Sequence, residues 1–285
     1  MLEPSVTIVI PVHNRVLDTI ECIESLTRID YGNFEILVVD DGSTDNTSGL
    51  ISEMFPTVKL LHGDGNLWWS GATNLGMIDA MSRGSDYVFL LNNDTVVERD
   101  SLSKLIESAE RNRQSIIAPV IRYYAERDKV WFSGGVILSF WRGLTHRTHL
   151  EQESTRHDRL LHADWLTGMM VVKVEYLEDL GLMDETTFPQ YWADSDFSLR
   201  ARKRGYTLLV DQESVIYHKV DITSERSGTR RRELLRPGSL LFDVKSPVNI
   251  CFVTRFFSRH FPSITMPILV FSFYQRWVRG VLIGH

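Results

Sequence analysis

Short apolar runs alternate with amphipathic stretches over the first part of the chain. The apolar runs are rich in β-branched residues and predict buried strands, while apolar positions at helical spacing predict the helices between them. The expected strands are residues 6–10, 34–39, 58–61 and 87–91, and the expected helices are 16–26, a segment capped by Thr44 or Asp45 that ends at 51, and 71–81. This order predicts a parallel sheet with right-handed crossovers.

The later pattern is less regular. Its expected elements are a strand at 131–139, a polar loop at 142–158, helices at 174–180 and 194–204, strands at 207–210 and 215–217, and a charged run at 225–236. We therefore expect an α/β domain over residues 1–225, divided into 1–95 and 96–225, and a helical extension over 226–285.

Polar clusters follow several of the expected strands, where ligands bind in parallel sheets. These clusters are His13-Asn14-Arg15, Asp40-Asp41 and Asn92-Asn93-Asp94. For each cluster taken alone, a helix cap or a turn is the alternative explanation to a ligand contact. Two successive acids at 40–41 exceed what a cap needs, so we expect a ligand contact there.

Composition and charge narrow the class of protein. The 285 residues are 43% hydrophobic and 24% charged, which are ordinary globular values. Only two cysteines occur, which excludes a disulfide scaffold and a cysteine-ligated zinc site. No basic region opens the chain, so we expect no secretory signal and a cytoplasmic protein.

The net charge of −6 is unevenly distributed, because residues 245–285 hold five basic side chains and no acidic one. Their apolar run is interrupted by Gln275, Arg276 and Arg279 and is too short to span a bilayer. We expect an amphipathic tail that lies on the inner face of the cell membrane, with packing on the domain or dimer formation as the alternative. An acidic body with a basic tail argues against nucleic-acid binding.

Several residues are candidates for chemistry. Asp94 beside two amides suits Mg²⁺ or Mn²⁺, and adjacent Trp68 and Trp69 suit a sugar platform. Asp194 and Asp196, next to aromatic residues at a helix start, are candidates for a general base, with simple capping as the alternative.

Taken in order, these motifs resemble family-two inverting glycosyltransferases of the GT-A fold, and most closely the bacterial rhamnosyltransferase-like members. The resemblance covers roughly residues 5–220. The segments that carry it are 8–15, 40–45, 66–76, 90–95, 165–168, 192–200 and Gly205-Tyr206.

The resemblance implies roles for individual residues. It implies a nucleotide-sugar half at 1–95 and an acceptor half at 96–225, with Asp194 as the catalytic base and Asp196 as the fallback. It places a metal ion at Asn92, Asp94 and His218. The donor-binding positions are Pro11, His13, Arg15, Asp41, Gly71, Asn74 and Asn93. The acceptor-binding positions are Trp68, Trp69, Trp165, Gly168 and Trp192.

The implied reaction moves a sugar from dTDP-rhamnose or a UDP-sugar to a glycan or lipid-linked acceptor. Two departures bear on it: Asn92 replaces the first acid of the metal motif, and Ala193 replaces the acid before the base. Nucleotidyl transfer and a catalytically silent nucleotide-sugar binder remain as alternatives.

Overall fold

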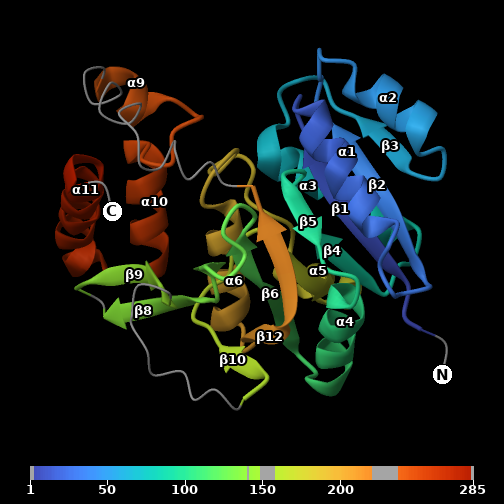
Figure 1. Ribbon diagram of the computed structural model, residues 1–285. Helices are drawn as coiled ribbons and strands as arrows, with labels where there is room; N and C mark the ends of the chain where they lie inside the picture. The colour runs from blue at the N-terminus through green and yellow to red at the C-terminus, as the bar shows by residue number, and fades with distance from the viewer. Residues whose placement is uncertain (1–2, 140, 148–157, 220–236, 284–285) are drawn as a thin grey trace.

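The computed structural model describes residues 3–139, 141–147, 158–219 and 237–283. Its core is a ten-stranded sheet with the strand order β10-β12-β6-β11-β4-β1-β2-β3. Outside this order, β5 pairs with β12 and β7 pairs with β6. The expected α/β fold with a mostly parallel sheet flanked by helices is confirmed (Figure 1).

The N-terminal half follows the predicted alternation. Its elements are β1 Val6–Val12, α1 Val16–Leu26, β2 Phe34–Asp40, α2 Thr47–Met54, β3 Lys59–His62, α3 Trp68–Ser82 and β4 Tyr87–Leu90. β1 pairs in parallel with both β2 and β4, and β2 pairs in parallel with β3. The order is therefore that of successive right-handed crossovers.

Most element boundaries differ from the prediction by one to three residues, and three of these differences bear on the site. β1 continues through Pro11, because β4 pairs only with residues 6–9 and no N–H toward β4 is needed at residue 11. α2 begins later than expected, since Asp45 accepts hydrogen bonds from the backbone of Val16 and Thr47. α3 begins earlier, so Trp68 and Trp69 lie in its first turn.

The second half contains elements that the pattern did not predict, namely β5 Thr95–Val97, α4 Ser101–Arg111, β6 Ser115–Tyr123, β10 Leu160–His162 and β11 Met170–Lys173. Its predicted elements are β7 Val130–Phe132, α5 Val174–Leu180, α6 Ala193–Lys203 and β12 Thr207–His218. β11 lies antiparallel between β4 and β6 and joins the two halves into one sheet. The two strands expected at 207–217 are one strand, β12, with an irregularity between Asp211 and Val215.

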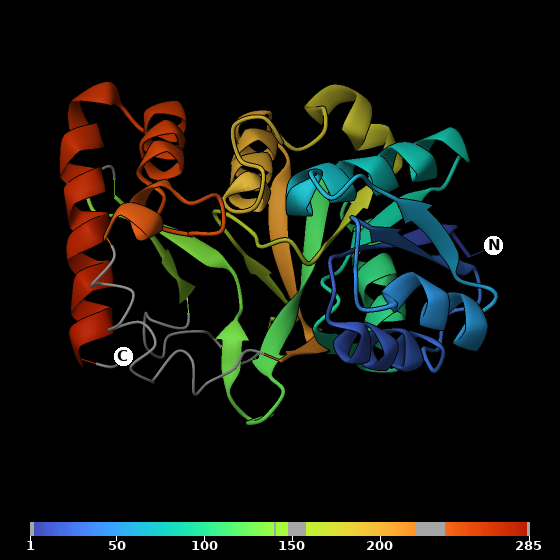
Figure 2. The same cartoon turned by 90° about the horizontal axis from the view of Figure 1, so that it is seen from above.

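Helices cover both faces of the sheet. α1, α2 and α4 lie on one face, and α3, α5 and α6 lie on the other (Figure 2). Buried side chains from both layers and from the strands form one apolar core. The loops at the carboxyl ends of β1, β2 and β4 remain uncovered by these helices, and this edge carries the site described below.

The C-terminal extension is helical, as expected, and consists of α9 Pro237–Phe242, α10 Ile250–His260, the short helix η2 Ser263–Thr265 and α11 Met266–Ile283. It lies beyond α6, next to a hairpin of β8 Gly135–Ser139 and β9 Gly143–His146 (Figure 1). Phe256, Phe257 and Leu269 of the extension are buried in the same core cluster as the sheet. The extension therefore packs on the domain instead of standing apart from it.

Two expected segments fall partly or wholly outside the described residues. Of the loop expected at 142–158, residues 143–146 form β9, and 148–157 are not described. The charged run at 225–236 also lies outside the description. Within the described ranges, no helix combines the length and apolar character needed to cross a membrane.

Candidate active site

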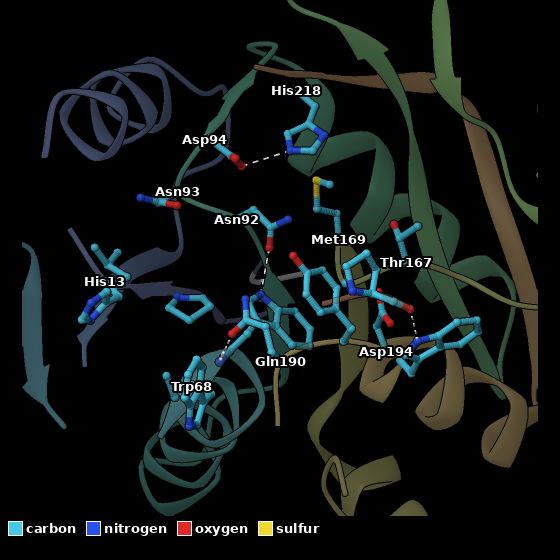
Figure 3. A pocket seen from close by; sticks show the side chains of 18 of the residues that line it. His13, Trp68, Asn92, Asn93, Asp94, Thr167, Met169, Gln190, Asp194 and His218 are labelled. Atoms are coloured by element: carbon cyan, nitrogen blue, oxygen red, sulfur yellow. Dashed lines mark hydrogen bonds and ion pairs between the residues drawn. The ribbon is translucent and has the colours of Figure 1, made fainter. Parts of the chain in front are cut away.

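A cavity of about 830 Å³ opens at the carboxyl ends of β1, β2 and β4. Its size lies within the range of small-molecule sites. The predicted residues that line it are Pro11, His13, Arg15, Asp41, Trp68, Trp69, Asn92, Asn93, Asp94, Trp165, Gly168, Trp192, Asp194 and His218. Figure 3 shows the labelled members of this set around one space.

Asp41 holds a loop as well as lining the cavity. Its two carboxylate oxygens accept hydrogen bonds from the backbone N–H groups of Gly65 and Trp68, at 2.8 and 2.9 Å. A side chain at Gly63 would bring a Cβ within 2.4 Å of the Asp41 carboxylate, so this loop needs a glycine there. The carbonyl of Asp41 accepts a hydrogen bond from His13 Nδ1 at 2.7 Å, which orients the His13 ring.

Asp94 lies between two potential partners. Its Oδ2 accepts a hydrogen bond from Arg15 at 2.9 Å, and its Oδ1 lies 3.1 Å from His218 Nε2. Burial acts to raise the pKa of Asp94, but the contacts with His218 and Arg15 outweigh it and leave the pKa below its ordinary value. Asp94 is therefore a carboxylate at neutral pH.

The Asp94–His218 pair fits a divalent cation. Two neighbouring ligands of an octahedral ion, each about 2.1 Å from the metal, lie about 3.0 Å apart, close to the observed 3.1 Å. Apart from this ion-pair contact, Asp94 Oδ1 has no partner within the described chain, and His218 Nδ1 has no hydrogen-bond partner there. No group of three or more His, Cys, Asp or Glu side chains with metal-binding geometry occurs in the described part, so the substrate would have to complete the coordination.

The two amides before Asp94 point elsewhere. Asn92 Oδ1, labelled in Figure 3, accepts a hydrogen bond from Trp69 Nε1 at 3.0 Å. The amide nitrogen of Asn93 donates to Thr19 at 2.9 Å. The side-chain oxygen of Asn92, which the metal assignment would use, thus already accepts a hydrogen bond from the tryptophan.

Asp194 lies at the start of α6 and faces the cavity. Figure 3 shows it beside Thr167, across the space from Asp94. Burial raises its pKa, and hydrogen bonds from the backbone of Ser195 and Gly168 only partly oppose this effect. A carboxylate with a raised pKa is suited to accept a proton from a substrate hydroxyl.

Asp196 has a different environment. It is fully buried, is not part of the cavity wall, and accepts hydrogen bonds from Arg200, Arg259 and His260 at 2.8 to 3.0 Å. Burial would raise its pKa, but these contacts hold it below the ordinary value. The fallback assignment of Asp196 as the base is therefore corrected.

Aromatic rings form much of the cavity wall. Trp69 lies against Gly168, where an added Cβ would approach the indole within 2.5 Å. Trp165 lies against Gly135, where an added Cβ would approach the indole within 2.0 Å. Trp192 also anchors the extension: its Nε1 donates to the carbonyl of Pro247 at 2.9 Å, and its ring packs 4.6 Å from that of Phe256. Trp68 and Trp192 have positive φ angles of 57° and 76°, a strained backbone that is common at functional sites.

Two predicted donor-binding residues do not line the cavity. Asn74 is buried, and its amide bonds the backbone of Met183 and the carboxylate of Glu185, so it joins α3 to the loop before α6. Gly71 faces Leu67 and Glu185. Both assignments are corrected, because the early start of α3 turns these positions toward the interior.

The wall also contains residues that sequence reasoning missed. They are Val12, Gly65, Ala72, Trp131, His146, Thr167, Met169, Gln190, Tyr191, Ser195, Lys245 and Pro247. Thr167 lies inside a motif that was recognised, and Lys245 opens the acid-free tail. The contact of Lys245 with the Trp68 ring, at 5.6 Å, joins positions too distant in sequence for any local pattern to connect.

The sequence profile described as glycosyl transferase family 2 matches residues 7–180, which is more than half of the chain. Glycosyltransferase GlyG of Streptococcus pneumoniae serotype 4 is 28% identical over 127 residues, covering 43% of this chain and 41% of that protein. A PGL/p-HBAD biosynthesis glycosyltransferase of Mycobacterium tuberculosis is 32% identical over 114 residues, covering 37% and 41%. The matched parts span less than half of these relatives.

Solved structures share the fold. A crystal structure of GalNAc-T7 with UDP, GalNAc and Mn²⁺ aligns with a TM-score of 0.63 at 15% identity, covering 94% of this chain and 54% of that one. A structure of TarS from S. aureus aligns with a TM-score of 0.60 at 14% identity, covering 97% and 54%. At these identities the likeness concerns the arrangement of helices and strands.

Proposed function

Because the chain belongs to glycosyl transferase family 2, we propose that it transfers a sugar from a nucleoside-diphosphate sugar to an acceptor hydroxyl, with Asp194 as general base. One observation carries this proposal: Asp194, with its raised pKa, lines the same cavity as the Asp94–His218 pair. The donor is dTDP-rhamnose or a UDP-sugar, and the acceptor is a glycan or lipid-linked hydroxyl used in surface polysaccharide synthesis.

The reaction is a single displacement. The acceptor oxygen attacks the anomeric carbon while the bond from that carbon to the diphosphate oxygen breaks, and the bonding electrons leave with the diphosphate. The acceptor proton passes to the carboxylate of Asp194. Because attack and departure take place on opposite sides, the anomeric configuration inverts.

The charge of the leaving diphosphate is met by groups at the other end of the cavity. Mg²⁺ or Mn²⁺ held by Asp94 and His218 would neutralise part of that charge. Arg15 and Lys245 also line the cavity, and Lys245 forms no ion pair with a carboxylate of the described residues. Lys245 is therefore available to a diphosphate.

The fold of the site also supports an assignment of the nucleotide and the acceptor to opposite ends of the cavity. Pro11, His13 and Asp41 form the end at which β1 and β2 terminate, and this is where ligands bind in such sheets. Gly168 contacts Asp194 through its backbone, and Trp165 and Trp192 line the same cavity. We assign the first group to the nucleotide and the second to the acceptor.

We further propose that the extension places the enzyme on the inner face of the cell membrane. Ile264, Ile268 and Phe271 are 79%, 46% and 68% exposed. Ile268 and Phe271 are three residues apart on α11 and therefore share a face, and Ile264 precedes them in η2. The basic residues Arg255, Arg276 and Arg279 of segment 245–285 are exposed, and this segment has no acidic residue. This charge favours an anionic lipid surface as the partner over a second protein chain.

Asp194→Asn provides the test of the catalytic assignment. Purified protein is incubated with Mn²⁺ and a panel of UDP-glucose, UDP-N-acetylglucosamine and dTDP-rhamnose, and release of the nucleoside diphosphate is followed. We expect the substitution to lower turnover by about 10²- to 10⁴-fold and to leave UDP binding nearly unchanged. A variant as active as the wild type would exclude Asp194 as base, and release of a sugar 1-phosphate in place of the nucleoside diphosphate would indicate nucleotidyl transfer.

Asp94→Ala tests the metal assignment without turnover. Calorimetry of UDP binding with and without Mn²⁺ should show that the metal strengthens binding to the wild type and has little effect on the variant, because Asp94 is the only carboxylate of its motif. Asp64→Ala, at an exposed carboxylate of the nearby loop, is the control. Equal metal dependence in both variants would contradict the assignment.

A further inference from the structure

The segment 184–196 carries much of the acceptor end of the cavity. It runs from Asp184, through the loop before α6, to Asp196 in the first turn of that helix. Gln190, Tyr191, Trp192 and Asp194 within it all line the cavity. The position of this segment therefore decides where the proposed base lies.

One side chain of the extension contacts both ends of the segment. Arg259, near the end of α10, donates to Asp184 Oδ2 at 2.7 Å and to Asp196 Oδ1 at 3.0 Å. The two nitrogens of one guanidinium are rigidly spaced, so these bonds fix the ends of the segment relative to each other. The backbone carbonyl of Arg259 also accepts a hydrogen bond from Lys203 at the far end of α6.

His260 adds a second bond at the helix end of the segment. Its Nε2 lies 2.8 Å from Asp196 Oδ1, and the two side chains are 1% and 0% exposed. A carboxylate buried this completely stays ionised only if charged or hydrogen-bonding partners surround it. Arg200 is the partner within α6, and the partners from outside this helix are both supplied by α10.

The middle of the segment is tied to the extension as well. Trp192, two residues before Asp194, donates its indole N–H to Pro247 and packs against Phe256. The extension therefore contacts the segment at its start, at its middle and at its end. Asp194 lies between the second and third of these contacts.

We propose that Arg259 and His260 are positioning residues of the active site, which hold segment 184–196 so that Asp194 meets the acceptor hydroxyl. The proposal rests on the proposed function of Asp194. It makes the C-terminal helices part of the catalytic machinery, although neither side chain is among the residues that line the cavity.

Hydrogen exchange tests the structural half without any substrate. Arg259→Gln removes the charge that joins Asp184 to Asp196, and we expect faster amide exchange over 184–196 with no change in β1 or β6. Arg255→Gln, at an exposed position one turn earlier on α10, is the matched control and should leave exchange unchanged. Unaltered exchange over 184–196 in Arg259→Gln would overturn the proposal.

A double-mutant cycle tests the catalytic half. Nucleoside-diphosphate release by water attack is measured with the panel of nucleotide sugars for Arg259→Gln, Asp194→Asn and the double variant. A misplaced base should slow turnover about 10- to 100-fold, while Mn²⁺-dependent UDP binding stays unchanged. If Arg259 acts through Asp194, its substitution should cause little further loss when Asp194 is already asparagine.

The outcomes separate this proposal from the proposed function. An active Asp194→Asn, or no turnover with any donor, contradicts the catalytic assignment, whereas the exchange experiment still decides whether Arg259 holds the segment. If Asp194→Asn is slow but the losses of turnover from Arg259→Gln and Asp194→Asn are fully additive, only the positioning role of Arg259 is contradicted.

If Arg259→Gln folds poorly, His260→Gln and His260→Leu are used in its place. Glutamine keeps an N–H donor near the position of Nε2 and should retain activity, whereas leucine has no donor and should lose it. Equal activity in both would overturn the role of His260.

Discussion

At the scale of single residues, Asp194 and Asp196 show how surroundings assign different roles to identical side chains. Asp194 faces the cavity, and burial raises its pKa. Asp196 is buried as well, but Arg200, Arg259 and His260 reverse the effect, so its pKa is lowered. The first carboxylate is suited to take up a proton, and the second is suited to remain ionised and hold α6.

These opposite shifts predict opposite effects on stability. Above the ordinary aspartate pKa of about 3.9, ionised Asp196 stabilises the fold, and this contribution disappears as the pH falls through its lowered pKa. At Asp194 the raised pKa means that the stabilising contribution belongs to the protonated form and is lost as the pH rises through that value.

Urea unfolding at pH 7 should therefore separate the two asparagine variants. Asp196→Asn should lower the free energy of unfolding by about 3–5 kcal/mol, because it leaves two arginines without their buried partner. Asp194→Asn should leave it unchanged or raise it. The difference in unfolding free energy between the wild type and Asp196→Asn should become smaller as the pH falls below the ordinary aspartate pKa. A difference that stays the same there would contradict the stabilising role of ionised Asp196.

At the scale of elements, the start of α3 shapes the cavity through the contact of Trp69 with Gly168. The loop held by Asp41 leads to Trp68, which has a positive φ. In the first turn of the helix, Trp69 then contacts Gly168, which lies just before β11. The indole N–H of Trp69 reaches Asn92 at the end of β4. A single ring thus joins three elements of the site.

Gly168→Ala should disturb this junction. A Cβ there would lie 2.5 Å from Trp69, closer than real contacts allow, so the indole must move. We expect a loss of about 1–3 kcal/mol in unfolding free energy together with weaker UDP binding in calorimetry. Trp69→Phe removes the ring atoms that would clash, so Gly168→Ala should be better tolerated in a Trp69→Phe background. Equal losses in both backgrounds would show that the contact is unimportant.

At the scale of the whole molecule, the extension is held by the same core as the sheet. Leu269 of α11 is fully buried, and Phe273 of α11 packs 5.5 Å from Trp192. Tyr274 donates to the carbonyl of Val248, which ties α11 to the segment before α10. The exposed apolar side chains Ile264, Ile268 and Phe271 lie apart from this buried face. One side of the extension therefore packs against the domain, and the other side is exposed.

Membrane association is best tested on that exposed face. Deletion of 263–285 would remove buried side chains, whereas Ile268→Glu combined with Phe271→Glu changes only exposed positions. We expect the wild type to sediment with vesicles of phosphatidylglycerol and phosphatidylcholine, and the double variant to remain in the supernatant with unchanged UDP binding. Ile78→Glu, an exposed apolar position on α3, is the control. If the wild type does not sediment but forms a dimer that the double variant lacks, the face is a protein interface instead.

The sequence by itself determined the local elements of the first half and the clusters at the strand ends. Residues 6–10 and 34–39 are mostly apolar and β-branched, and polar residues that follow them mark the ligand edge. The sequence determines these features because periodicity and turn chemistry act over a few neighbouring positions. The order of motifs also indicated the family, which the profile match confirmed.

Only the tertiary structure decided which of these side chains remain available to a ligand. The side-chain oxygen of Asn92 accepts a hydrogen bond from Trp69, and the amide of Asn74 bonds Met183 and Glu185. Asp196 accepts a hydrogen bond from Arg259 of α10, which lies 63 residues later in the chain. It also placed β11 antiparallel between two parallel sets of strands and brought Lys245 to the cavity. Each of these outcomes depends on contacts between distant positions, and local hydrophobic spacing carries no signal for the partner that a polar side chain meets when the layers pack together.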